Sequence, residues 1–120
     1  MPSFYDALEK RSADERLAEL SEELPKLIEL AKTKTTHYRE TLAGLDPSAI
    51  SSPEKLASLP VLRKSSLIQN PDQPLAVESV LPNDLSEIHH IFQSPGPIFE
   101  VGMRKKDWWR FGRALVPVGI

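Results

Sequence analysis

The stretch SADERLAELSEELPKLIELA, residues 12–31, decides the fold class of this chain. It opens with a capping box, because the Ser12 hydroxyl can accept a hydrogen bond from the Glu15 amide while the Glu15 carboxylate can accept one from the Ser12 amide. Apolar side chains then recur at steps of three and four residues, at Leu17, Leu20, Leu24, Leu27, Ile28 and Ala31. This period predicts an amphipathic helix with one apolar face. Pro25 lies inside the pattern and removes one helical hydrogen bond, so we expect either a kink or two helices there.

Short helical pieces are predicted after this helix. Residues 37–42 read as a second helical piece, with Gly44 as its C-terminal stop. Asp46 and Ser52 each stand directly before a proline. This pattern predicts that each residue caps a short helix of one or two turns at most. Residues 63–68 predict one more short helix.

The C-terminal third predicts a hairpin and a last helix. Residues 88–93 and 98–101 read as two strands joined across the turn Ser94-Pro95-Gly96-Pro97. Residues 105–118 follow with heavy apolar side chains at steps of three, four and three, at Trp108, Phe111, Leu115 and Val118. This spacing predicts an amphipathic helix. Together the elements predict one α+β domain over residues 1–120, mostly α, with a helical N-terminal part, one β-hairpin and a C-terminal amphipathic helix.

Composition excludes several function classes. The chain has 120 residues, no cysteine, 15 Lys and Arg against 17 Asp and Glu, and a formal charge of −2. The absence of cysteine excludes disulfides, thiolate catalysis and cysteine-type zinc sites. The charge balance gives no general attraction to nucleic acid or to an anionic membrane, so neither is expected as a partner. The start MPSFYD lacks a signal-peptide pattern, and no run approaches the roughly 20 apolar residues of a membrane helix. We therefore expect a cytoplasmic protein.

Two local patterns in the sequence are candidate sites. His89 and His90 are neighbours on a predicted strand, so their side chains should point to opposite faces and not share a metal. We expect one of them packed and the other exposed, and no metal site. The cations at residues 104–106 precede Trp108 and Trp109, a mixture that can hold single-stranded nucleic acid. A solvated first helical turn is the favoured interpretation, with the two indoles about 100° apart and at least one of them in a core or an interface.

The order of the pieces carries a family resemblance. The chain shows, in order, FYD at residues 4–6, a helix ending near HYR at 37–39, LDPSAI at 45–50 and LPVLRKSSL at 59–67. This order resembles the N-terminal part of phenylacetate–CoA ligase and its relatives, the AMP-forming adenylating enzymes. That family carries a Leu-Pro-x-x-x-Lys-x-x-Leu segment, which residues 59–67 match. The resemblance extends over nearly the whole chain, from about Phe4 to Ile120.

The resemblance implies an N-terminal segment of an acid–CoA ligase and no catalytic residue in this chain. The parent would use ATP, magnesium and CoA to turn a carboxylic acid into an acyl-adenylate and then a thioester, while this chain itself holds no cofactor. The first seven positions of the family's phosphate loop, Ser-Ser-Gly-Thr-Thr-Gly-Lys-Pro, correspond to residues 94–100, where Ser94 and Gly96 match. The other compared positions differ and hold Pro97, Ile98, Phe99 and Glu100. Family members are several times longer, and the apolar end at residues 118–120 fits a chain that continues into a sheet.

The alternative function is a stand-alone helical protein-interaction module that can form a homodimer. Its contact surfaces would be the acidic helix before Pro25 and the face formed by Trp108, Phe111 and Leu115, because exposed aromatic area favours association. The expected partner is therefore either the remainder of a parent chain or a second copy.

Overall fold

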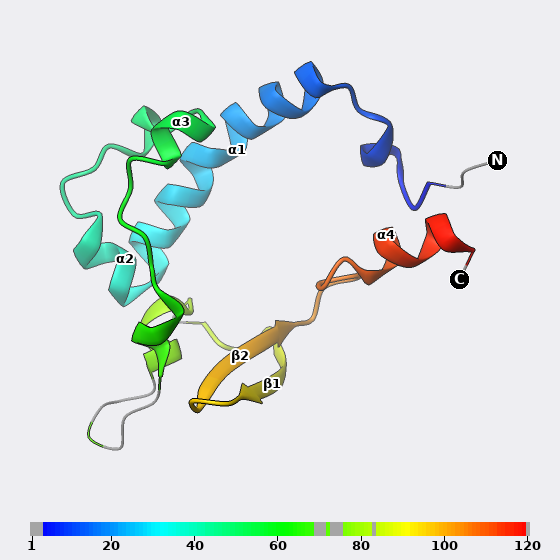
Figure 1. Cartoon of the computed structure of the whole chain (residues 1–120). Helices are drawn as coiled ribbons and strands as arrows, with labels where there is room; N and C mark the ends of the chain where they lie inside the picture. The colour runs from blue at the N-terminus through cyan, green and yellow to red at the C-terminus, as the bar shows by residue number, and fades with distance from the viewer. Residues whose placement is uncertain (1–3, 69–71, 73–75, 83, 120) are drawn as a thin grey trace.

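The computed structural model describes residues 4–68, 72, 76–82 and 84–119, so Ile120 lies outside it. Its elements follow one another as the 3-10 helix η1 (Ala7–Lys10), α1 (Ala13–Lys34), α2 (Thr36–Thr41), η2 (Pro47–Ala49), α3 (Pro53–Leu56), η3 (Lys64–Leu67), η4 (Ala76–Val80), β1 (Ile88–Ser94), β2 (Ile98–Met103), α4 (Phe111–Leu115) and η5 (Val116–Val118) (Figure 1). The two strands form one antiparallel hairpin. The fold is thus α+β and mostly α, as the sequence predicts.

The long helix α1 starts at the predicted capping box. The Ser12 hydroxyl accepts from the Glu15 amide at 3.2 Å, and the Glu15 carboxylate accepts from the Ser12 amide at 2.7 Å. α1 then continues without interruption through Pro25, so the expectation of two helices is wrong. Only one helical hydrogen bond is lost at a proline, and the burial of Leu24 and Ile28 on both sides of it keeps the two halves in one element.

The capping box makes α1 sensitive to acid. Hydrogen bonds from the backbone and side chain of Ser12 lower the pKa of Glu15 below its ordinary value of 4.5. A carboxylate with a lowered folded pKa stabilises the fold fully above its ordinary value, and this contribution is lost as the pH falls through the lowered pKa. We therefore expect the helix signal in circular dichroism to fall as the pH drops below about 4.5. Glu15→Gln should weaken this acid response, whereas Glu22→Gln, on the same helix, should retain it. An unchanged acid response in Glu15→Gln would contradict the assignment.

A small core joins α1 to the segment that follows it. Ile28, Leu42 and Ile50 are buried together, and Tyr38, Leu45 and Leu59 pack against them. The Thr35 hydroxyl, which is also buried, accepts from the Tyr38 amide and donates to the Ala31 carbonyl. The Lys32 ammonium donates to the Leu45 carbonyl across the same junction. These contacts fold the helical part back on itself.

The predicted short elements form where their caps are. The side chains of Asp46 and Ser52 accept hydrogen bonds from backbone amides in the first turns of η2 and α3. η3 lies within the predicted residues 63–68. α2 ends at Thr41 with Leu42 as its C-cap, and Gly44 lies beyond it without a positive φ, so Gly44 is not the left-handed stop that we expected.

The C-terminal helix is shorter than predicted. α4 begins at Phe111, whereas the periodicity predicted a start near residue 105. Asp107 and Arg110 have φ angles of 51° and 58°, which a right-handed helix cannot contain. The Asp107 carboxylate accepts from the Gly112 amide at 2.8 Å and so stabilises this turn. Trp108 therefore lies in a turn before the helix.

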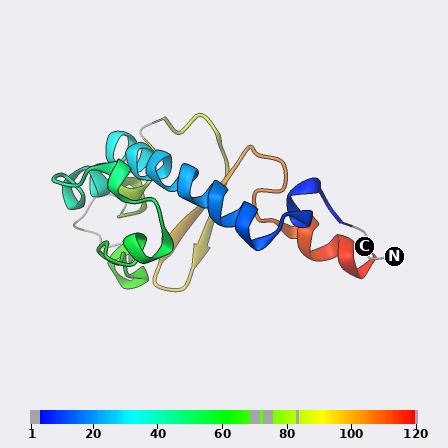
Figure 2. The same cartoon turned by 90° about the horizontal axis from the view of Figure 1, so that it is seen from above.

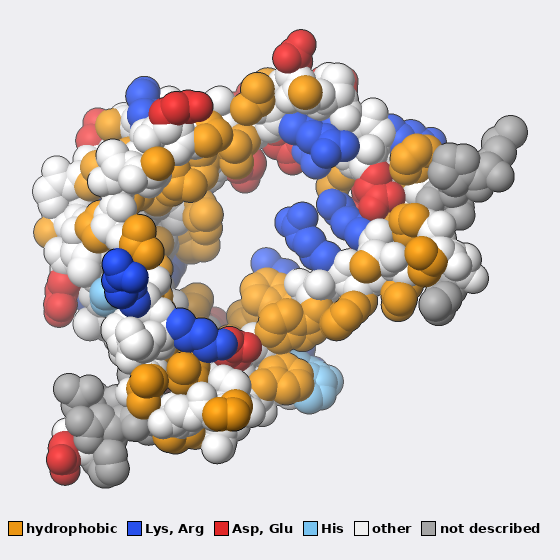
Figure 3. All heavy atoms as spheres, in the orientation of Figure 1, with side chains coloured by type: hydrophobic (Ala, Val, Ile, Leu, Met, Phe, Trp, Pro, Cys, Tyr) orange, Lys and Arg blue, Asp and Glu red, His pale blue; other side chains and the backbone are white. Residues whose placement is uncertain are grey.

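The two ends of the chain meet and close a ring. The Tyr5 ring lies against Gly112, where a Cβ atom would stand 2.4 Å from Tyr5 Cε2. Next to it Arg113 pairs with Asp6 at 2.7 Å. Figures 1 and 2 show the N-terminal segment beside α4, and Figure 3 shows an opening within the ring that side chains do not fill.

The ring has a large surface for its length. Its radius of gyration is 17.1 Å, whereas a compact chain of this length has about 13.6 Å. Its accessible surface is 8919 Å², whereas a compact monomer of this mass exposes roughly 6,500 Å². Among the described residues, the buried hydrophobic side chains are Leu24, Ile28, Leu42, Ile50 and Ile98. Much apolar surface therefore stays in contact with solvent.

Candidate functional site

The predicted phosphate loop is the turn of the hairpin. The Ser94 hydroxyl donates to the Ile98 carbonyl at 3.4 Å, so it is engaged within the hairpin. Gly96 has a φ of 152°, and a Cβ atom there would stand 2.9 Å from the Ile98 side chain, so the turn requires glycine. Pro95 and Pro97 have no amide hydrogen. The turn therefore offers few donors to a phosphate group.

An ion pair occupies the acidic position of this loop. Glu100 accepts from Lys64 Nζ at 3.2 Å, and both side chains are exposed. Lys64 is the lysine of the Leu-Pro-x-x-x-Lys segment, 36 residues earlier in the chain. The segment at residues 59–67 and the loop at residues 94–100 thus meet in space. The charge that would repel a phosphate faces a cation of the protein instead. Sequence reasoning identified both residues without pairing them.

The two histidines lie side by side, which corrects the expectation of opposite faces. The register of the hairpin shifts between Ile88 and His90, as in a β-bulge, and the alternation of side chains is lost there. The His89 and His90 Nδ1 atoms are 2.8 Å apart, and one ring therefore donates to the other. Both rings are exposed, so the expectation of one packed histidine is also wrong. The described residues contain no group of three or more His, Cys, Asp or Glu that could hold a metal ion.

Exposed aromatic rings form a continuous cluster between the hairpin and the turn before α4. We define this aromatic cluster as His90, Phe92, Trp108 and Trp109. The Phe92 ring lies 5.8 Å from that of His90 and 5.8 Å from that of Trp109, and the two indoles are 6.5 Å apart at 75°. Edge-to-face contacts at these distances are favourable. Phe92, Trp108 and Trp109 are all between 41% and 50% exposed, so the cluster offers a wide apolar surface.

The predicted interface residues Trp108, Phe111 and Leu115 do not share one helical face. Trp108 belongs to the aromatic cluster, whereas Phe111 and Leu115 lie on α4. All three are exposed, Phe111 at 65%. The divergence of about 100° expected for Trp108 and Trp109 assumed a helix and is wrong, because the turn brings the two rings into contact. Neither indole is buried in the chain, so of the two predicted roles, core or interface, only the interface stays a prediction.

A cationic cavity of about 690 Å³ lies where the two ends of the chain meet. Its lining is Tyr5, Asp6, Lys105, Lys106, Asp107, Trp108, Arg110 and Arg113. Both carboxylates are engaged, Asp6 by Arg113 and Asp107 by the Gly112 amide. Four cations against two acids leave the cavity positively charged, and Figure 3 shows Lys and Arg side chains around the opening. The arrangement can attract an anion. Sequence reasoning found the lysines but missed Tyr5 and Asp6, because no local pattern links segments 100 residues apart.

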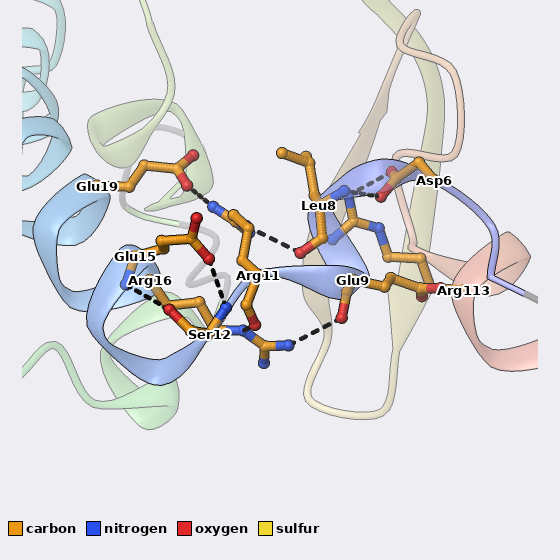
Figure 4. Close-up of polar contacts among 9 residues, drawn as sticks. All are labelled: Asp6, Leu8, Glu9, Arg11, Ser12, Glu15, Arg16, Glu19 and Arg113. Carbon is orange, nitrogen blue, oxygen red and sulfur yellow. Dashed lines mark hydrogen bonds and ion pairs between the residues drawn. The ribbon is translucent and has the colours of Figure 1, made fainter.

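Arginine side chains fix the N-terminal segment to α1 (Figure 4). Arg11 Nε donates to the Leu8 carbonyl at 2.8 Å, and its guanidinium pairs with Glu19 of α1. Arg16 of α1 donates to the Glu9 carbonyl at 3.1 Å. The segment that carries the N-terminal half of the cavity is therefore held from both sides, by α1 and by α4.

An apolar groove of about 410 Å³ lies between α1, α2 and α3. Its lining is almost entirely aliphatic and consists of Leu27, Ile28, Ala31, Tyr38, Leu42, Leu56, Ala57, Leu59, Pro60 and Val61. Val61 is 80% exposed. Besides the aromatic cluster, the chain thus has a second apolar surface, which lies between its N-terminal helices.

Comparison with protein families, curated proteins and solved structures gave no match. Within the part of the chain that the structure describes, no helix combines the length and the apolar character needed to cross a bilayer.

Proposed function

We propose that this chain is the N-terminal segment of an AMP-forming acid–CoA ligase-like protein of the phenylacetate–CoA ligase type. In such a parent a carboxylic acid and ATP give an acyl-adenylate and pyrophosphate, and CoA then displaces AMP to give the thioester. The chain's own task is to dock against the remainder of the parent, which carries the catalytic groups. The order of the motifs at residues 4–6, 37–39, 45–50 and 59–67 supports the family assignment. We place the protein in the cytoplasm as part of this proposal.

The large surface of the ring is the observation that carries the docking role. The accessible surface of 8919 Å² exceeds that of a compact monomer by roughly 2,400 Å². A standard protein interface buries about 800 Å² on each partner. The excess is therefore large enough for the chain to complete its fold against another protein surface. The aromatic cluster and the neighbouring Phe111 form the apolar part of this surface.

The hairpin turn does not fit the phosphates of ATP. The Ser94 hydroxyl is hydrogen-bonded to the Ile98 carbonyl, and Glu100 is paired with Lys64. Pro95 and Pro97 have no amide hydrogen to donate. In the proposed parent, ATP, magnesium and CoA therefore belong to the remainder of the protein. Ser94 and Gly96 shape the turn in this chain.

The purified chain is accordingly expected to show no ATP-dependent exchange of pyrophosphate. The exchange of labelled pyrophosphate into ATP is measured with phenylacetate as the acid, and an intact phenylacetate–CoA ligase serves as the positive control. Exchange by the chain alone above the blank would show that it is a catalyst, and the proposal would be wrong.

The docking role is tested with the tryptophans as reporters. Addition of a phenylacetate–CoA ligase that lacks its N-terminal segment should shift the emission of Trp108 and Trp109 to the blue, because docking removes both indoles from water. Trp109→Asp should bind much more weakly, whereas Val61→Asp, remote from the aromatic cluster in the sequence, should bind as the unchanged chain does. An unchanged emission spectrum at saturating partner would contradict docking through this cluster.

The second candidate function is the stand-alone interaction module. One observation favours it, namely four exposed leucines on α1 that no described element covers: Leu17, Leu20, Leu27 and Leu30. Leucines on a solvent-exposed helix face are typical of helix pairing.

A further inference from the structure

We propose that α1 is a self-association helix, which pairs antiparallel with α1 of a second copy of this chain through Leu17, Leu20, Leu27 and Leu30. This inference goes beyond the proposed function, because it holds whether or not the chain belongs to a ligase-like parent. We call these four side chains the leucine stripe.

The leucine stripe borders the side of α1 that the chain already uses, and it is the exposed part of the helix's apolar surface. Leu24 and Ile28 are buried inside the chain. Leu17, Leu20, Leu27 and Leu30 are 52%, 38%, 57% and 50% exposed. A shallow groove of about 350 Å³ runs along this part of the helix, lined by Leu20, Glu23, Leu24, Lys26, Leu27 and Leu30. Seen from above, α1 lies in front of the other elements (Figure 2).

The spacing of the leucine stripe fits a two-fold axis. α1 spans 22 residues, and its midpoint lies between Glu23 and Leu24. Leu20 and Leu27 are equally far from this midpoint, and the same is true of Leu17 and Leu30. Antiparallel pairing about a two-fold axis at the midpoint therefore places Leu20 opposite Leu27 and Leu17 opposite Leu30 of the second copy. A two-fold interface of this kind needs such self-complementarity.

The charges of α1 favour the antiparallel direction. The first half of the helix carries five acids and one base, in the order Asp14, Glu15, Arg16, Glu19, Glu22 and Glu23. The second half carries three bases and one acid, in the order Lys26, Glu29, Lys32 and Lys34. Antiparallel pairing sets each acidic half against a basic half, whereas parallel pairing sets acid against acid. Complementary charge selects orientation in this way in paired helices. A second copy of the chain is thus the occupant that matches both the leucine spacing and the charge.

Single-cysteine variants test the pairing and its direction, because the chain has no cysteine of its own. In the antiparallel pair, position 23 lies beside position 23 of the partner, whereas position 30 lies about 20 Å along the helix axis from its counterpart. A disulfide needs Cα atoms within about 7 Å. Glu23→Cys should therefore form a disulfide-linked dimer on mild oxidation, and Leu30→Cys should not. Val61→Cys, on an exposed residue outside α1, measures linkage by random collision.

Every outcome of this test has a clear meaning. Linkage of Glu23→Cys well above the Val61→Cys level, with Leu30→Cys at that level, supports the proposal. Linkage of both α1 variants shows a parallel pair, and linkage of neither, or of Leu30→Cys alone, shows that the proposed pair does not form; each of these results overturns the proposal. Sedimentation of cysteine-free chains is the second readout. Leu20→Ala, which keeps a good helix former, should raise the dimer dissociation constant about 30-fold or more, while the helix signal in circular dichroism stays unchanged. An unchanged constant would also overturn the proposal. Neither result depends on pyrophosphate exchange, so the failure of one proposal is distinguishable from the failure of the other.

Discussion

Ile28→Ala is expected to lower the free energy of unfolding by about 2–5 kcal/mol. Ile28 is 6% exposed and packs with Leu42 and Ile50 in the small core that joins α1 to the segment after it. Truncation removes apolar contacts and leaves a cavity, and so few side chains are buried that little packing remains to compensate. The whole stability of a small domain is about 5–15 kcal/mol. The helical part of the chain should therefore melt at a much lower temperature than in the unchanged protein.

The measurement is denaturant unfolding followed by circular dichroism, with Leu27→Ala as the matched control. Leu27 is the preceding residue on the same helix but is 57% exposed, so its truncation should change the free energy of unfolding by only about 0.5 kcal/mol. Both variants are measured at a concentration at which sedimentation shows monomers, because Leu27 belongs to the leucine stripe. Equal losses in the two variants would show that the core does not lie where the structure places it.

Gly112→Val is expected to separate the two ends of the chain. A Cβ atom at position 112 would stand 2.4 Å from Tyr5 Cε2 and 2.9 Å from two further atoms of that ring. The Tyr5 side chain must leave, and the ion pair between Asp6 and Arg113 beside it should be lost as well. Overpacking of this kind costs about 1–3 kcal/mol, which shifts the balance between joined and separated ends about 5- to 150-fold. The cationic cavity should disappear, because its lining comes from both ends.

Spin labels on Phe4→Cys and Val118→Cys measure the distance between the ends, and solution scattering measures the radius of gyration. In Gly112→Val the distance between the ends should increase, and the radius of gyration should rise above 17.1 Å. Gly44→Val is the control, since nothing lies within 4 Å of a Cβ atom at position 44. In a Tyr5→Ala background the Gly112→Val change should have little further effect. If the distance stays the same in Gly112→Val, the ends are not joined through this contact.

Several elements were predictable because their signals are local. The capping box of Ser12 and Glu15, the caps at Asp46 and Ser52 and the hairpin across residues 94–97 all formed as expected. Each depends on hydrogen bonds or turn chemistry within a few residues. The wrong predictions for the two histidines and the last helix have a different cause. The bulge at Ile88 and His90 and the positive φ angles at Asp107 and Arg110 break a period that the side-chain pattern alone assumes to continue.

The candidate sites were less predictable than the elements that carry them. Gly96 lies in the hairpin turn, whereas Ser94 is the last residue of β1, and its hydrogen bond to the Ile98 carbonyl was not expected. The aromatic cluster could not be foreseen either, because Phe92 joins Trp109 only through the turn that replaces the predicted first part of the last helix.

Local patterns in the sequence predict most of the helical and extended segments, their caps and the mostly α class, because periodicity and capping act between residues at most a few positions apart. Which of these segments meet follows only from the tertiary structure. The pair of Asp6 with Arg113 spans 107 residues and the pair of Lys64 with Glu100 spans 36. Nothing in either local pattern specifies the partner, because such contacts depend on the path of the whole chain between them. The ring, the cationic cavity and the exposed leucine stripe all follow from that path.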